Sequence, residues 1–287
     1  MLLLQFLKYF NDHNYITFAI MLQEYKVNIN GSKISYYKSG LGEKVVITFH
    51  GFGQSGKSFQ AFEKALPGYQ FYHINLFFHE NSYLHPHHRP LSAQHWVELF
   101  IAFLTHEKIH FFSLAGFSIG CRLIYNISQK LAHRVKNIIL LAPEGKNYSK
   151  WYRISVSLFP GLFKYFIFNA GIFFSILGFL KKLRIIDTIT AKFACTQMMS
   201  RKQRWQVYMT WMNFRLLKPD FNHWFSTMNQ NNVTISIFVG KQDKIIPSGN
   251  AMFMNERLNK VTLQYMSAGH FNLIKKSAAF YAQNSKM

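Results

Sequence analysis

A serine stands between two glycines at residues 116–120, in the pentapeptide Gly-Phe-Ser-Ile-Gly. An apolar run over Ile109–Leu114 precedes it and predicts a strand, while Ile119–Leu131 predicts an apolar helix. A sharp strand-to-helix turn lifts a serine hydroxyl clear of the sheet, at a helix N-terminus whose dipole favours developing negative charge. Ser118 is therefore the candidate nucleophile. The alternative is a capping serine in a glycine-rich turn.

A carboxylate and a histidine follow two later predicted strands. Asp243 comes after the apolar run Val233–Val239, and His270 comes after Val261–Tyr265. A serine nucleophile needs a base to accept its proton, and the imidazole needs a carboxylate to fix its tautomer and stabilise its cation. These positions predict His270 as the base and Asp243 as the acid behind it.

Acyl transfer also needs two backbone N–H groups directed at the oxyanion. One is expected from Ile119, the residue after the nucleophile. The other is expected from the glycine-rich segment His50-Gly-Phe-Gly, which follows the apolar run Val45–Phe49. Phe52 is the candidate donor there, and His50 is interpreted as a structural histidine at a strand end.

These segments lie in an alternation of strands and helices. Strands are predicted at 25–29, 33–38, 45–49, 71–74, 110–114, 135–141, 233–239 and 261–265. Helices are predicted at 58–66, 93–105, 119–131 and 247–258, with a last helix near the C-terminus. Such alternation indicates an α/β fold with a central, mostly parallel β-sheet flanked by helices. The candidate residues would then share the carboxyl edge of the sheet.

The alternation stops between residues 145 and 231, where the periodicity is helical. We predict a helical cap at 145–231, inserted into a core of 21–144 and 232–287. Residues 1–20 are an N-terminal extension, either an appended helix or a consequence of the start codon.

The apolar stretch Tyr165–Leu180 is 16 residues long, which is short of the ~20 needed to span a bilayer. A buried cap helix is predicted, with docking at a membrane interface as the alternative. An aromatic run is assigned to the inner face of the cap: Trp205, Tyr208, Trp211, Met212 and Phe214.

The composition indicates a globular, strongly basic protein. Hydrophobic residues make up 49% of the chain, and 33 Lys and Arg stand against 12 Asp and Glu, a formal net charge of +21. This charge favours anionic partners such as a membrane surface, unless it reflects a general basic bias of the source proteome. No nucleic-acid-binding motif is present, so no nucleic acid is expected.

Two distant cysteines, Cys121 and Cys195, favour a reducing compartment. We expect a cytoplasmic protein, with peripheral contact to anionic membrane left open.

A group of histidines invites a metal interpretation: His79, His85, His87 and His88. Pro86 and Pro90 indicate a loop there rather than a rigid element that could space metal ligands. We predict a solvated loop and no metal site.

Together these segments resemble the α/β-hydrolase fold family over roughly residues 24–285. The resemblance is carried by His50-Gly-Phe-Gly, the serine pentapeptide, Gly240-Lys-Gln-Asp243 with Ile246-Pro247, and Gly269-His270. It implies a triad of Ser118, Asp243 and His270 in the chain order of that family, an oxyanion hole at Phe52 and Ile119, and a lid made by the insertion.

The resemblance also raises a second candidate acid, because some members place it after the sixth strand. Glu144 stands there, and Asp243 is preferred because its strand-end setting matches the commoner arrangement. Two departures separate the chain from narrower subfamilies. The turn over Asn75–Ser82 lacks the family's glycine-rich pattern, and Cys121 replaces the usual small residue after the elbow.

The expected function is a serine hydrolase that cleaves an ester, thioester or related acyl bond through an acyl-enzyme on Ser118, without cofactor or metal. The phenylalanine-rich cap predicts an apolar, lipid-like small-molecule substrate. Two alternatives stay open. One is other chemistry on the same scaffold, such as a carbon–carbon bond hydrolase, a perhydrolase or a lyase. The other is a non-catalytic protein that binds a membrane surface. The sequence does not predict an oligomeric state.

Overall fold

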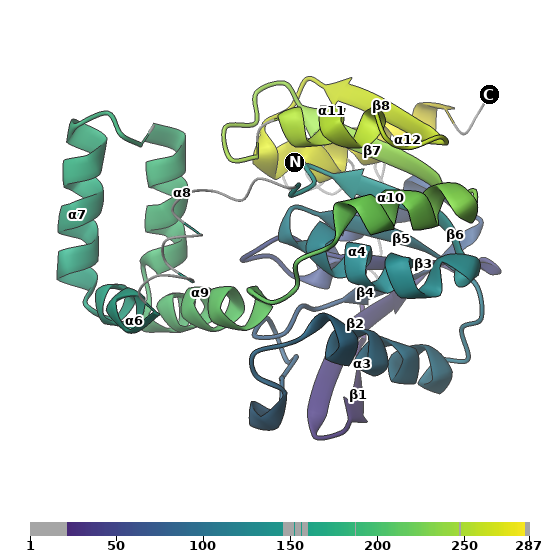
Figure 1. Ribbon diagram of the computed structural model, residues 1–287, viewed down its shortest axis with the longest axis horizontal. Helices are drawn as coiled ribbons and strands as arrows, with labels where there is room; N and C mark the ends of the chain where they lie inside the picture. Colours follow the sequence, from purple (N-terminus) through teal and green to yellow (C-terminus); the bar gives the residue numbers. More distant parts are fainter. Residues whose placement is uncertain are drawn as a thin grey trace, which may run out of the picture.

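The core is an eight-stranded sheet with strand order β1-β2-β4-β3-β5-β6-β7-β8 (Figure 1). The computed structural model describes residues 22–145, 160–186, 188–246 and 248–284, together with Tyr152 and Val156. The predicted extension at 1–20 lies outside the described residues. β2 pairs antiparallel with both β1 and β4, and every later pair is parallel. This arrangement confirms the predicted α/β fold.

The strands are β1 (Glu24–Ile29), β2 (Ser32–Ser39), β3 (Lys44–Phe49), β4 (Tyr69–Ile74), β5 (Phe112–Phe117), β6 (Val135–Leu141), β7 (Thr234–Gly240) and β8 (Val261–Met266). The helices of the core are α2 (Ala61–Ala65), α3 (Ala93–His106), α4 (Ile119–Leu131), α11 (Gly249–Asn255) and α12 (Leu273–Asn284). The helices between β6 and β7 are α6 (Pro160–Phe168), α7 (Ala170–Lys182), α8 (Thr188–Met198), α9 (Arg201–Phe214) and α10 (Phe221–Gln230).

Apolar layers cover both faces of the sheet, which is why its central strands are continuous apolar runs. One layer contains residues of α3, α4, α10 and α11, and the other contains residues of α2 and α12. All six residues of β5 are buried. Burial on both faces fixes the central strands in place, and the loops at their carboxyl ends can therefore hold side chains in a defined geometry.

Three local predictions differ from the structure in their boundaries. β5 ends at Phe117 rather than at Leu114, because the chain stays extended up to the turn at Ser118. The helix predicted at 58–66 is a 3₁₀ turn over Gly56–Phe59 followed by the short helix α2. The helix predicted from Pro247 begins at Gly249 as α11, and Pro247 itself lies outside the described residues.

The inserted helices α6, α7 and α8 extend to one side of the core, whereas α10 lies against it (Figure 1). The side chain of Trp224 in α10 is fully buried, and its indole N–H donates to the Ser128 hydroxyl of α4 at 2.8 Å. α7 and α8 stand side by side, and they are joined at the end that lies away from α9.

The prediction of a buried cap helix over Tyr165–Leu180 is wrong. The stretch is divided between α6 and α7, with a bend of 96° between 161–168 and 170–182, and α7 has no buried residue. Within the described part of the chain, no single helix is long and apolar enough to cross a membrane. Only this bent pair meets the criteria of length and composition together.

Candidate active site

Ser118 occupies a strained turn between β5 and α4. Its backbone has φ 53° and ψ −120°, a combination that side-chain-bearing residues adopt only where their surroundings enforce it. The Ser118 N–H donates to the carbonyl of Leu141 at 2.9 Å, which ties the turn to β6. The side chain is largely enclosed, with 8% of the residue exposed.

The two flanking glycines are required by close packing. A Cβ atom on Gly120 would lie 2.2 Å from the carbonyl oxygen of Phe49, so no side chain fits between α4 and β3. A Cβ atom on Gly116 would lie 2.6 Å from Cδ1 of Ile124 and 3.1 Å from the backbone nitrogen of Cys121. The sharp turn predicted from the pentapeptide is therefore held by backbone contacts on both sides.

Asp243 and His270 meet at the carboxyl edge of the sheet. The Nδ1 atom of His270 lies 2.7 Å from Oδ2 of Asp243, and the two side chains are 7% and 1% exposed. The other carboxylate oxygen accepts the backbone N–H groups of Ile245 and Ile246, at 2.8 and 3.0 Å. The carboxylate is thus fixed at both oxygens. A proton on Nδ1 leaves Nε2 of His270 as the basic nitrogen.

Glu144, the alternative acid, is engaged elsewhere. Its carboxylate forms an ion pair with the guanidinium of Arg122, whose Nε donates to Oε2 at 2.9 Å. The same guanidinium donates to the Tyr152 hydroxyl at 2.7 Å and to the carbonyl of Phe214 at 3.3 Å. Arg122 therefore links α4 to Tyr152, which precedes α6, and to the end of α9, a role that the sequence did not indicate.

Ser118 and His270 lie on neighbouring segments of one edge. The ring centroid of His270 is 4.7 Å from that of Phe117, the residue before Ser118. Among the described residues the Ser118 hydroxyl forms no hydrogen bond. A serine–base hydrogen bond that forms only with substrate bound is common in ligand-free enzymes.

Phe52 and Ile119 have the positions expected of oxyanion donors. Ile119 is the first residue of α4, and Phe52 follows the end of β3. Neither backbone N–H donates to another group within the described parts of the chain. Two unpaired N–H groups beside a nucleophile can bind the oxygen of a tetrahedral intermediate.

His50 is a structural residue, as its strand-end position indicates. Its ring is fully buried, with Nδ1 2.7 Å from the Gly51 carbonyl and Nε2 accepting the Leu76 N–H at 3.0 Å. Burial, together with the neighbouring ring of His79, holds the pKa of His50 well below its ordinary value. The neutral ring therefore supports the loop after β3, which carries the predicted oxyanion donor Phe52.

The prediction of a solvated loop is wrong for His79. This residue is 1% exposed, and its Nε2 accepts the Gly53 N–H at 3.1 Å while Nδ1 lies 3.2 Å from the Phe77 carbonyl. Burial lowers the pKa of His79 to about 4. Its ring also packs against that of Phe52, at 5.4 Å between centroids. His79 thus holds the loop that carries the predicted oxyanion donor, and its burial was not recognisable from the sequence.

Helix α8 approaches this edge from the insertion. A Cβ atom on Gly53 would lie 2.4 Å from Oε1 of Gln197, and the ring of Phe193 lies 5.5 Å from that of Phe271, next to His270. Phe52 also packs against an apolar cluster built from α6, α8 and α9. The environment of the candidate site is therefore apolar on the side of the insertion.

Cys121 is not a second nucleophile. Its thiol is fully buried and donates to the Gly116 carbonyl at 3.2 Å, and burial raises the thiol pKa far above its ordinary value.

The other departure from the family pattern is structural: the Ser82 hydroxyl donates to the Asn75 carbonyl at 2.7 Å, and both side chains contact Ser35 in a buried polar cluster. Over the described residues, no three His, Cys, Asp or Glu side chains are grouped to hold a metal ion.

Comparison with known proteins agrees with the fold. A model of the alpha/beta hydrolase fold family matches residues 44–277. A comparison with curated protein sequences finds no match.

Solved structures match over most of the chain at low identity. A membrane phospholipase A described as a bacterial virulence factor has a TM-score of 0.65 at 14% identity, covering 92% of this chain and 85% of its own. A thermophilic esterase from Thermogutta terrifontis has a TM-score of 0.64 at 14% identity, covering 92% and 97%. The thioesterase domain of the curacin biosynthetic pathway has a TM-score of 0.61 at 15% identity, covering 91% and 98%.

Proposed function

Because the chain belongs to the alpha/beta hydrolase fold family, we propose that it is a serine hydrolase that cleaves a carboxylic ester, a thioester or a related acyl bond. The observation that carries the proposal is the buried 2.7 Å hydrogen bond between Asp243 and His270. It orients the imidazole at the same sheet edge as the strained turn of Ser118. These are the parts that acyl transfer through a serine nucleophile needs.

The reaction follows from the roles of these groups. Nε2 of His270 accepts the Ser118 proton as Oγ attacks the acyl carbon, and the N–H groups of Phe52 and Ile119 bind the oxyanion. Asp243 stabilises the imidazolium, which then protonates the departing alcohol or thiol and leaves an acyl-enzyme on the serine. A water molecule that gives its proton to His270 attacks the acyl group, and the carboxylic acid leaves as the hydroxyl is restored.

The substrate class is proposed from the side of the site that the insertion covers. Phe52, on the loop after β3, packs against the apolar cluster of α6, α8 and α9, and the ring of Phe193 lies against that of Phe271. Apolar walls of this kind bind an alkyl or aryl group and contribute little to the binding of a charged one. We therefore propose an apolar acyl group. The solved structures that this fold resembles include an esterase and a thioesterase domain.

Hydrolysis of a series of p-nitrophenyl esters, from acetyl to long acyl chains, tests the proposal. The wild type is expected to hydrolyse them with a preference for medium or long chains, and Ser118→Ala is expected to lose the activity. If the wild type is inert, labelling by a fluorophosphonate probe decides the matter. Labelling that is absent in Ser118→Ala supports a serine hydrolase with a different substrate, and no labelling of the folded wild type would contradict the proposal.

A further inference from the structure

The outer side of the helical insertion carries an apolar surface. Helices α6 and α7 and the segment after them expose the following large hydrophobic residues: Leu162, Tyr165, Ile172, Ile176, Phe179, Leu183, Ile185 and Ile189. Single exposed hydrophobic residues are ordinary in proteins, but several that share one helix face mark a surface that contacts something apolar.

Four of these residues form one stripe along α7. Ile172, Ile176, Phe179 and Leu183 follow each other at intervals of four, three and four residues, so they lie on one face of the helix. Between 38% and 60% of each residue is exposed. α7 stands away from the sheet (Figure 1), and none of its residues is buried. We call these four residues the α7 stripe.

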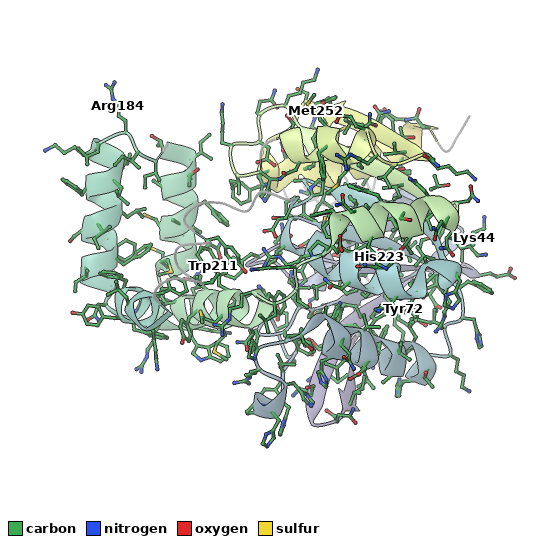
Figure 2. All side chains as sticks on the ribbon, viewed as in Figure 1. Lys44, Tyr72, Arg184, Trp211, His223 and Met252 are labelled. Atoms are coloured by element: carbon green, nitrogen blue, oxygen red, sulfur yellow. The ribbon has the colours of Figure 1, made fainter. Side chains whose placement is uncertain are left out.

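Helices α6, α7 and α8, which we call the hairpin together with the segment between α7 and α8, carry several cations and almost no acidic residue. These cations are Lys164 in α6, Lys181 and Lys182 at the end of α7, Arg184 after it and Lys192 in α8, and Asp187 is the only acidic residue in the sequence between 160 and 219. In the described part of the chain none of these five cations forms an ion pair. Arg184 projects from the end of α7, away from the core (Figure 2).

We propose that α6 and α7 dock into the interface of an anionic lipid bilayer. The α7 stripe would enter the boundary between headgroups and acyl chains, while Lys181, Lys182 and Arg184 contact lipid phosphates. The length of α7 favours docking over spanning, because its 13 residues extend about 20 Å and a bilayer core is about 30 Å thick. The excess of cations makes anionic lipid, rather than neutral lipid, the partner.

The docked hairpin would bring the candidate site to the membrane. α8 pairs with α7 and also contacts the edge of the site, where Phe193 lies against Phe271. If the proposed hydrolase function holds, an acyl substrate could reach Ser118 from the lipid phase without crossing water. Lipid binding itself does not rest on that function, and the two are measured separately.

Flotation with lipid vesicles tests the proposal on the full-length protein. Vesicles of phosphatidylcholine alone are compared with vesicles that also contain phosphatidylglycerol. We expect the wild type to float with the anionic vesicles. Ile172→Ser/Ile176→Ser/Phe179→Ser is expected to lose roughly a hundredfold in partition coefficient. Leu41→Ser is the matched control, because Leu41 is fully exposed in the loop before β3.

The cations are tested with a second pair of variants. Lys181→Gln/Lys182→Gln/Arg184→Gln is expected to weaken binding to anionic vesicles by about fivefold for each charge removed. Lys275→Gln/Lys276→Gln removes two exposed charges of α12, far from the α7 stripe, and is expected to bind nearly as the wild type does. Far-UV circular dichroism and thermal unfolding establish that each variant is folded.

Three results would overturn the proposal. One is a folded wild type that floats with neither vesicle. Another is a triple variant of the α7 stripe that binds anionic vesicles as strongly as the wild type, because binding would then reflect only the general attraction of a basic protein to anionic lipid. The third is a wild type that binds no lipid and forms a dimer in solution, together with a triple variant of the α7 stripe that is monomeric. The α7 stripe would then be an interface between two copies. Flotation of a folded protein that neither hydrolyses the esters nor is labelled by the fluorophosphonate probe would contradict the proposed function and leave lipid docking intact.

Discussion

At the residue scale, the two candidate acids have different partners. Asp243 bonds to His270, and Glu144 bonds to Arg122. Both follow a buried strand, which is why their positions in the sequence could not separate them fully. The difference lies in contacts between residues that are far apart in the chain. Because the partners differ, we expect substitutions of the two carboxylates to have different effects.

Asp243→Asn is expected to lower kcat roughly 10⁴-fold with little change in stability, because an amide favours the wrong tautomer of His270. Glu144→Gln is the matched control. It is expected to keep kcat within a few fold and to lower the midpoint of thermal unfolding, because Arg122 loses the carboxylate it contacts. Ester hydrolysis and unfolding curves of the two variants check both effects. A large kcat loss in Glu144→Gln with an unaffected Asp243→Asn would reverse the assignment of the acid.

At the element scale, the position of Ser118 depends on how closely α4 approaches β3. Gly120→Ala would place a Cβ atom 2.2 Å from the Phe49 carbonyl, so helix and strand must separate. A loss of about 1–3 kcal/mol in the free energy of unfolding is expected, with a larger relative loss in kcat because the turn moves.

Gly178→Ala is the control for this change. Gly178 lies inside α7, and no atom lies within 4 Å of a Cβ placed there. The exchange is expected to leave kcat unchanged and to stabilise the helix by about 0.5–1 kcal/mol. Urea unfolding and ester hydrolysis measure both variants. Equal activity and stability of the wild type and Gly120→Ala would contradict the close packing of α4 on β3.

Elements with a strong local signal were predictable from the sequence. Helix α4 and strand β6 have the predicted bounds, 119–131 and 135–141, because apolar periodicity and the glycine-flanked turn define them locally. The burial of His79 and the exposure of α7 were not predictable. Each depends on which surface another segment covers, and a sequence of apolar residues is the same whether it faces a protein core or an outer surface.

At the scale of the whole molecule, basic residues far outnumber the acidic residues that could pair with them. Acidic residues of the described chain that form ion pairs include Glu24, Glu63, Glu98, Glu107, Glu144 and Asp243. With 33 Lys and Arg against 12 Asp and Glu, most cations have no such partner. The insertion from 160 to 219 contains one acidic residue and exposes apolar side chains as well, which is the combination that an anionic lipid surface attracts.

The stability of the whole molecule should decline in acid because of His50 and His79, two buried histidines whose pKa values are lowered in the fold. In the unfolded chain a histidine binds a proton near pH 6.5, whereas the pKa of His79 in the fold is lowered to about 4. Stability from the neutral ring is therefore complete above pH 6.5 and lost as the pH falls toward 4. For His79 the loss amounts to about 3 kcal/mol, and the lowered pKa of His50 adds a loss of the same sign.

Urea unfolding followed by tryptophan fluorescence, from pH 7.5 down to 4.5, measures this decline. His79→Gln is expected to be less stable than the wild type at pH 7.5, because the ring that accepts the Gly53 N–H is gone. Its stability should then fall less steeply with pH, since one group no longer takes up a proton on unfolding. His133→Gln, at an exposed histidine, should retain the slope of the wild type. If His79→Gln retains that slope as well, His79 is not held neutral in the fold, and its role under the oxyanion loop must be assigned differently.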